Sequence, residues 1–204
     1  MFEKINVIEI CKRHLNTLYD ANSNEKKTDY GIFFGIPYIF AVLFLLLNPI
    51  ITGTLQTIIS TVFAIFTALL LSLLLLLFTM SEKIPENMDE DRKIKVLDVL
   101  KQTIYSISFL ILISIISLIV ILFLAIITAS YDTKYVVIIQ LMNIVNISLC
   151  VEIITRIFIF LQILFSFISY YLLGIFLLTL LMVLKRVSIL LWTILGLENS
   201  DKSK

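Results

Sequence analysis

Few side chains in this sequence have the type and spacing that chemistry requires. His14 is the only histidine, and the two cysteines, Cys11 and Cys150, lie far apart with no CxxC pair. Because structural zinc needs clustered Cys and His ligands at short spacing, no zinc site is expected. Asp89 and Asp91 are two residues apart, and such residues point in different directions on a helix. A solvated helix start is therefore favoured over a divalent cation site between these carboxylates.

The long apolar runs lack the ionisable side chains that membrane enzymes and transporters use. Ion-coupled transporters and proton relays place Asp, Glu, Lys or His within their spans, but Leu55–Met80 and Ile104–Ala129 contain none of these. Intramembrane proteases need a nucleophile with a base, or two aspartates, and neither pattern occurs. P-loop and GxGxxG motifs are also missing from the sequence. We therefore expect no enzyme, no catalytic residue, no cofactor and no metal.

The composition predicts that helices in a membrane carry most of the chain. Of the 204 residues, 60% are hydrophobic and only 15% are charged, whereas soluble domains have about a quarter of their residues charged. A helix needs roughly 20 apolar residues to cross a bilayer. We therefore predict an all-α integral membrane protein with a four-helix transmembrane bundle over residues 30–184. The predicted spans are 30–48, 55–80, 104–129 and 157–184.

The apolar stretch Tyr135–Leu184 admits two interpretations. It is too long for one crossing, since 50 residues of helix extend about 75 Å, and a polar break at 130–134 precedes it. Either an outer interfacial helix near 135–153 precedes a fourth span, or both halves cross and give five spans. Lys and Arg collect on the cytoplasmic side, and four spans leave only Lys134 and Arg156 outside. We therefore predict four spans in the bacterial inner membrane, with both termini cytoplasmic.

Three segments are predicted to lie on the cytoplasmic side. Residues 1–29 contain an amphipathic helix and a hinge, the loop 81–101 contains a cytoplasmic extension of the third helix, and residues 185–204 form a tail. The first helix either lies on the inner leaflet or forms a docking surface for a soluble protein. The candidate surface for a cytoplasmic protein partner consists of Lys12, Arg13, Arg92 and Lys93.

Small residues recur at helical spacing within the predicted spans. Membrane helices pack through small residues, because lipid tails already satisfy large apolar surfaces. The strongest such pattern, in the second span, consists of Ser60, Ala64, Ala68 and Ser72. The first span adds the GxxxG pair Gly31 and Gly35. These stripes would either pack the bundle within one chain or meet another copy.

A pore is the other use that these polar residues would have. The candidate lining residues are Ser60, Thr67, Ser72, Ser114, Ser117, Gln162 and Ser166. Serines in membrane helices usually bond their own backbone or a neighbouring helix. The pore is therefore the weaker hypothesis.

Three segments resemble a set of small bacterial inner-membrane proteins with four predicted spans. They are His14–Ala41 (HLNTLYDANSNEKKTDYGIFFGIPYIFA), Leu100–Ile115 (LKQTIYSISFLILISI) and Tyr170–Val187 (YYLLGIFLLTLLMVLKRV). Such proteins are often encoded in mobile or phage-defence loci, and the membrane subunit of Kiwa-type defence is similar in size and layout. The resemblance implies topology and a defence role, and it implies no catalytic or binding residue.

Two functions follow as expectations. The first is a non-enzymatic membrane component of a multi-protein system for anti-phage defence, which forms homo-oligomers in the lipid bilayer and anchors or signals to a cytoplasmic partner. The alternative is a small stand-alone channel or transporter. The net charge of +1 implies no direct attraction to nucleic acid.

Overall fold

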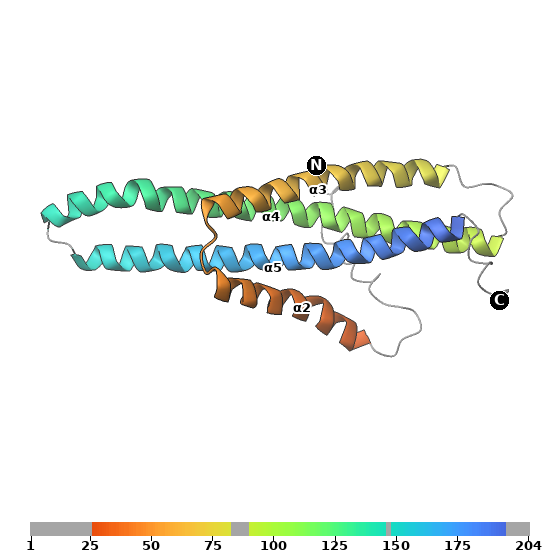
Figure 1. Cartoon of the computed structure of the whole chain (residues 1–204), viewed down its shortest axis with the longest axis horizontal. Helices are drawn as coiled ribbons and strands as arrows, with labels where there is room; N and C mark the ends of the chain where they lie inside the picture. The colour runs from red at the N-terminus through yellow and green to blue at the C-terminus, as the bar shows by residue number, and fades with distance from the viewer. Residues whose placement is uncertain (1–25, 83–89, 146–147, 195–204) are drawn as a thin grey trace, which may run out of the picture. The chain divides into compact units, whose positions relative to one another are not determined.

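The computed structural model describes residues 26–82, 90–145 and 148–194, and these residues form four α-helices (Figure 1). The helices are α2 (Lys26–Leu47), α3 (Gly53–Glu82), α4 (Glu90–Val145) and α5 (Ser148–Ile194). None of the described residues lies in a strand. The prediction of an all-helical chain is thus confirmed for the part that the structure describes.

Three of the helices are long and apolar enough to cross a membrane. The membrane-length segments are Gly53–Ser81, Val96–Ala129 and Ile153–Trp192. The apolar part of α2, Phe33–Leu47, is shorter, since roughly 22 Å of helix does not reach across a hydrocarbon core of about 30 Å. By helix length and composition the chain is a multi-pass membrane protein. A full crossing by α2 stays a prediction.

The end of the third predicted span differs from the sequence-based expectation. Helix α4 continues without interruption through residues 130–134 to Val145, and α5 begins at Ser148. The predicted break and the separate outer helix near 135–153 are therefore wrong, because the two halves of that segment belong to α4 and α5. Residues 130–134 are polar but include neither proline nor glycine, so nothing in them removes a backbone donor or favours a break.

The extension of the third helix is confirmed as helix, because α4 begins at Glu90, before the apolar run. The apolar tail likewise continues α5 as far as Ile194. The cytoplasmic location of both segments stays a prediction. The predicted amphipathic helix within 1–29 and the last ten residues of the tail lie outside the described residues.

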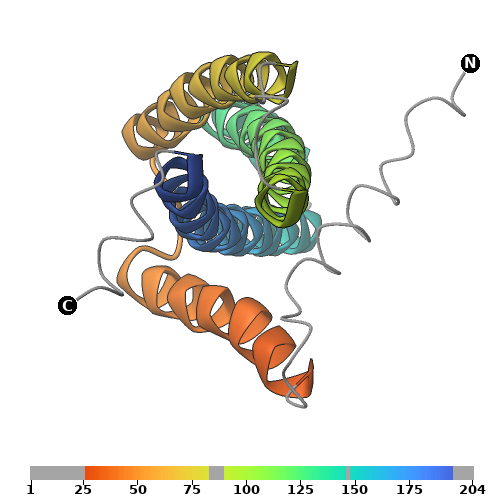
Figure 2. The same cartoon turned by 90° about the vertical axis from the view of Figure 1, so that its right-hand side faces the viewer.

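Contacts divide the chain into two compact units. The first contains Met1–Phe33, Phe66–Ile113 and Phe176–Lys204, and its described core lies where α3, α4 and α5 run side by side (Figures 1 and 2). Its buried residues recur at spacings of three, four or seven, which is typical of helices packed at a small crossing angle. They include Leu70 and Leu77 of α3, Val96, Leu100, Ile107 and Leu110 of α4, and Phe176, Val183 and Leu190 of α5.

The second unit contains Phe34–Ile65 and Ser114–Ile175. In this unit α2 approaches α5 very closely, because a Cβ placed on Gly174 would lie 3.0 Å from both Cα and Cβ of Pro37. Aromatic pairs extend the contact along the two helices. Their ring centroids lie 5.9 Å apart for Tyr38 and Phe167 and 5.6 Å apart for Phe44 and Tyr170.

Candidate functional site

Helix α3 has a buried face and an exposed face, and most of the predicted small-residue stripe lies on the exposed one. The buried apolar residues are Ile59, Phe63, Leu70 and Leu77. In the stripe, Ser60 is half-buried, whereas Ala64, Ala68 and Ser72 are exposed. Each step of four residues rotates by about 40° around a helix with 3.6 residues per turn, so the stripe moves round the helix from Ser60 to Ser72. We call these four residues the α3 small-residue face.

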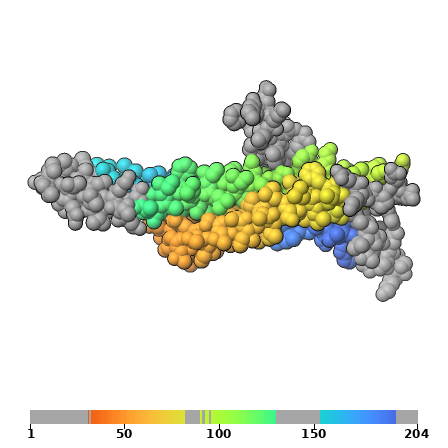
Figure 3. Space-filling view, turned by 90° about the horizontal axis from the view of Figure 1, so that it is seen from above, coloured from red at the N-terminus to blue at the C-terminus, as the bar shows by residue number. Residues whose placement is uncertain are grey.

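The exposure of this face has a different meaning from the exposure of the leucines around it. Exposed Leu69 and Leu76 suit a surface in contact with lipid. Exposed Ala and Ser instead leave the helix backbone accessible, which allows a second helix to approach closely. The first half of α3 lies at the surface beside α4 (Figure 3). No described residue therefore prevents another helix from approaching the α3 small-residue face.

The GxxxG pair on α2 is also uncovered within the described part of the chain. A Cβ placed on Gly31 or on Gly35 would meet no heavy atom within 4 Å. The pair was predicted as a helix-packing site or an oligomer interface, and no described residue packs against it. Its use as an interface with another copy stays a prediction.

Many small and polar residues of α4 and α5 are instead buried within the chain. Those that are buried include Thr103, Ser106, Ser114 and Ser117 of α4 and Gln162, Ser166, Ser169 and Thr179 of α5. Several hydroxyls donate to the carbonyl one turn earlier, as Thr103 Oγ1 does to Val99 O at 2.7 Å and Ser169 Oγ to Phe165 O at 2.9 Å. This is the behaviour expected of hydroxyl side chains in apolar helices.

The proposed pore lining does not share one face of the single chain. Ser114, Ser117, Gln162 and Ser166 are buried against neighbouring helices, whereas Ser72 is exposed. Residues of such different exposure do not line a common path. A channel therefore gains no support from this arrangement.

The connection between α2 and α3 is held by side chains of α5, a role that the sequence did not reveal. Tyr170 OH donates to Asn48 O at 3.3 Å, and the backbone N–H of Ile51 donates to Ser166 Oγ at 3.3 Å. Non-helical backbone in an apolar environment must find such partners. Ser166, a candidate pore residue by sequence, is thus a positioning residue for this connection.

Arg186 makes a second contact that the sequence did not predict. Its Nη1 donates to Gln102 O at 3.2 Å and also to Ser106 Oγ. Ser106 Oγ in turn donates to Gln102 O at 3.0 Å. The sequence placed Arg186 among the basic flanking residues, whereas in the first unit its guanidinium links α5 to α4.

The predicted partner surface is only partly described. Lys12 and Arg13 lie outside the described residues, and Arg92 and Lys93 lie in the first turn of α4. Lys93 is half-buried. Whether these four residues form one surface stays a prediction.

The described residues offer no alternative centre of chemistry. Among the residues whose side chains the structure describes, no three His, Cys, Asp or Glu lie together as metal ligands would. What the arrangement supports is contact between helices. No protein-family model, no curated protein and no solved structure matches the chain, so the resemblance to phage-defence membrane proteins stays a prediction.

Proposed function

We propose that this protein is a non-enzymatic membrane component that self-associates through the α3 small-residue face and anchors a soluble partner on the cytoplasmic side. One observation supports self-association above all others. The buried serines among the described residues all lie on α4 and α5, whereas Ala64, Ala68 and Ser72 of α3 are exposed. Since helices in lipid associate through small residues, an exposed set of this kind supports contact with another copy.

The topology that accompanies this proposal has four spans in the bacterial inner membrane, with both termini in the cytoplasm. In this arrangement α2 crosses the bilayer, and its first turn brings Lys26 and Lys27 to the inner surface. Fourteen of the 16 basic residues then lie on the cytoplasmic side, as the distribution of Lys and Arg in membrane proteins favours. Lys12, Arg13, Arg92 and Lys93 would face the soluble partner. A role in anti-phage defence rests on the resemblance alone.

Self-association is tested by the mass of the purified protein. Ala68→Phe places a large ring on the α3 small-residue face, and Ile119→Phe places the same ring on α4, where Ile119 is exposed. We expect wild type and Ile119→Phe to run above the monomer mass in mild detergent by light scattering, and Ala68→Phe to run as a monomer. A monomeric wild type, or an unchanged mass for Ala68→Phe, would contradict the proposal.

A further inference from the structure

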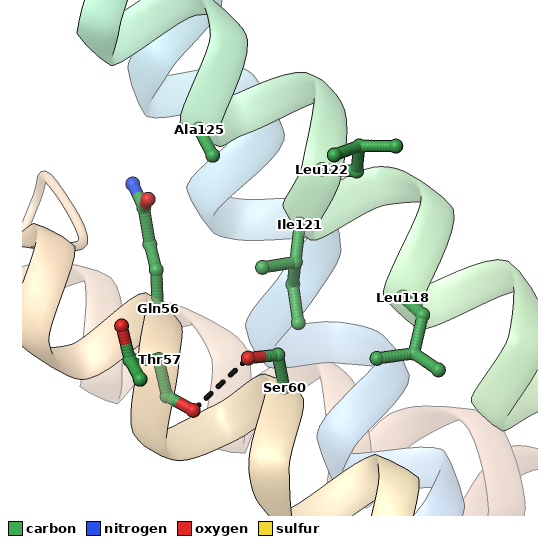
Figure 4. A pocket seen from close by; sticks show the side chains of 7 residues that line it. All are labelled: Gln56, Thr57, Ser60, Leu118, Ile121, Leu122 and Ala125. Atoms are coloured by element: carbon green, nitrogen blue, oxygen red, sulfur yellow. Dashed lines mark hydrogen bonds between the residues drawn. The ribbon is translucent and has the colours of Figure 1, made fainter.

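A groove lies between α3 and α4 in the second unit. Its volume is about 380 Å³, and it is open on one side. Gln56 and Ala125 lie at one end, while Ser60 and Leu118 lie at the other (Figure 4). The residues from α4 are all apolar, and the three from α3 are all polar.

The polar side of the groove contains a buried acceptor that no described residue satisfies. Gln56 is 7% exposed, and its Nε2 donates to Ile51 O at 3.1 Å and to Thr128 Oγ1 at 3.4 Å. Its Oε1 accepts no hydrogen bond from a residue whose side chain or backbone the structure describes. An unsatisfied polar atom of this kind is costly in an apolar environment, so it favours a ligand that donates.

The two hydroxyls beside Gln56 add acceptors to the same side. Thr57 Oγ1 donates to Gly53 O at 3.0 Å, and Ser60 Oγ donates to Thr57 O at 2.9 Å. Because each hydroxyl proton is already used, each oxygen keeps only its capacity to accept. The groove therefore presents oxygen acceptors on α3 and apolar side chains on α4.

We propose that this groove binds a phospholipid whose head group donates hydrogen bonds, with an ammonium of the phosphatidylethanolamine class directed at Gln56. Gln56 lies in the first turn of α3, close to the exposed residues Thr52 and Thr54, which places it near the end of the apolar segment. An acyl chain would run towards Leu118. Leu122, which lines the groove and is 60% exposed, provides apolar surface on the α4 side.

The test compares two lipids that differ in their head-group ammonium, where three N-methyl groups of one replace the three N–H donors of the other. Phosphatidylethanolamine has three ammonium N–H donors, whereas phosphatidylcholine with the same acyl chains has none. We expect the protein, exchanged into an equimolar mixture and examined by native mass spectrometry, to retain phosphatidylethanolamine about three- to tenfold more than phosphatidylcholine, the preference given by one net hydrogen bond. Gln56→Leu should bring this ratio to one.

Two alanine substitutions separate this inference from self-association. Ala125→Phe fills the groove and should release both lipids, while Ala64→Phe, on the α3 small-residue face, should leave lipid retention unchanged and alter only the mass of the assembly. A wild-type ratio of one, or a preference that persists in Gln56→Leu, would overturn the lipid assignment. It would also be overturned if Ala125→Phe changed the mass of the assembly and not the lipids, because the occupant would then be a second copy.

Discussion

The approach of α2 to α5 depends on the missing side chain of Gly174. A Cβ at this position would lie 3.0 Å from Cα and Cβ of Pro37, while carbon atoms in good contact lie about 3.5–4.0 Å apart. One of the two atoms belongs to the backbone, so a side-chain rotation cannot relieve the clash. In Gly174→Ala, α2 must therefore move away from α5 by about half an ångström or more.

The expected loss of stability follows from this clash. Forcing an extra methyl into a packed contact typically costs about 1–3 kcal/mol. Replacing glycine by alanine in a helix also stabilises the helix by about 0.5–1 kcal/mol. This gain would partly offset the free energy lost through the clash. Gly35→Ala in α2 provides the matched control, because a Cβ there would meet nothing described within 4 Å. The helix term is common to both variants, so their difference isolates the contact.

The measurement is equilibrium unfolding in mild detergent with increasing sodium dodecyl sulfate, followed by far-ultraviolet circular dichroism. We expect Gly174→Ala to be less stable than Gly35→Ala by about 1–3 kcal/mol. Equal stability of the two variants would refute the close packing of α2 on α5. It would also contradict the aromatic contacts that Tyr38 and Phe44 of α2 make with α5.

Two further predictions concern the polar contacts and use the same unfolding assay. Arg186→Met removes the donors to Gln102 O and Ser106 Oγ and should lower the free energy of unfolding by about 1.5–3 kcal/mol. Lys185 is an exposed neighbour, so Lys185→Met should change the free energy of unfolding by less than about 0.5 kcal/mol. Equal effects of the two variants would contradict the role of Arg186. Tyr170→Phe removes the bond to Asn48 O and should cost about 0.5–1.5 kcal/mol. Tyr171→Phe should cost less, because Tyr171 makes no hydrogen bond to a described residue, and a greater loss for Tyr171→Phe would argue against the anchored connection.

The sequence predicted the helices well because apolar runs of membrane length have few other stable forms. It misplaced the end of the third helix because the polar segment 130–134 indicates an interruption, although polar residues without proline or glycine do not end a helix. The helix continues to Val145 instead. Polarity alone is thus a poor marker of where a long helix stops.

The sequence identified the α3 stripe but did not reveal which way it faces. The leucine, isoleucine and phenylalanine residues of α3 are distributed all the way round the helix. No contrast between a polar and an apolar face therefore marks the buried side of α3. The groove at Gln56 and the contact of Arg186 were missed for a related reason, since both depend on partners more than 70 residues away. Such pairs follow from packing and leave no local pattern.

Contact between copies of this chain through the α3 small-residue face is tested by disulfide cross-linking in native membranes. In a background with Cys11→Ser and Cys150→Ser, single cysteines replace Ala64, Ala68 and Ser72 on α3 and Ile119 on α4. We predict oxidised dimers for the substitutions on α3 and none for Ile119→Cys. Equal cross-linking at all four positions, or none on α3, would contradict this contact.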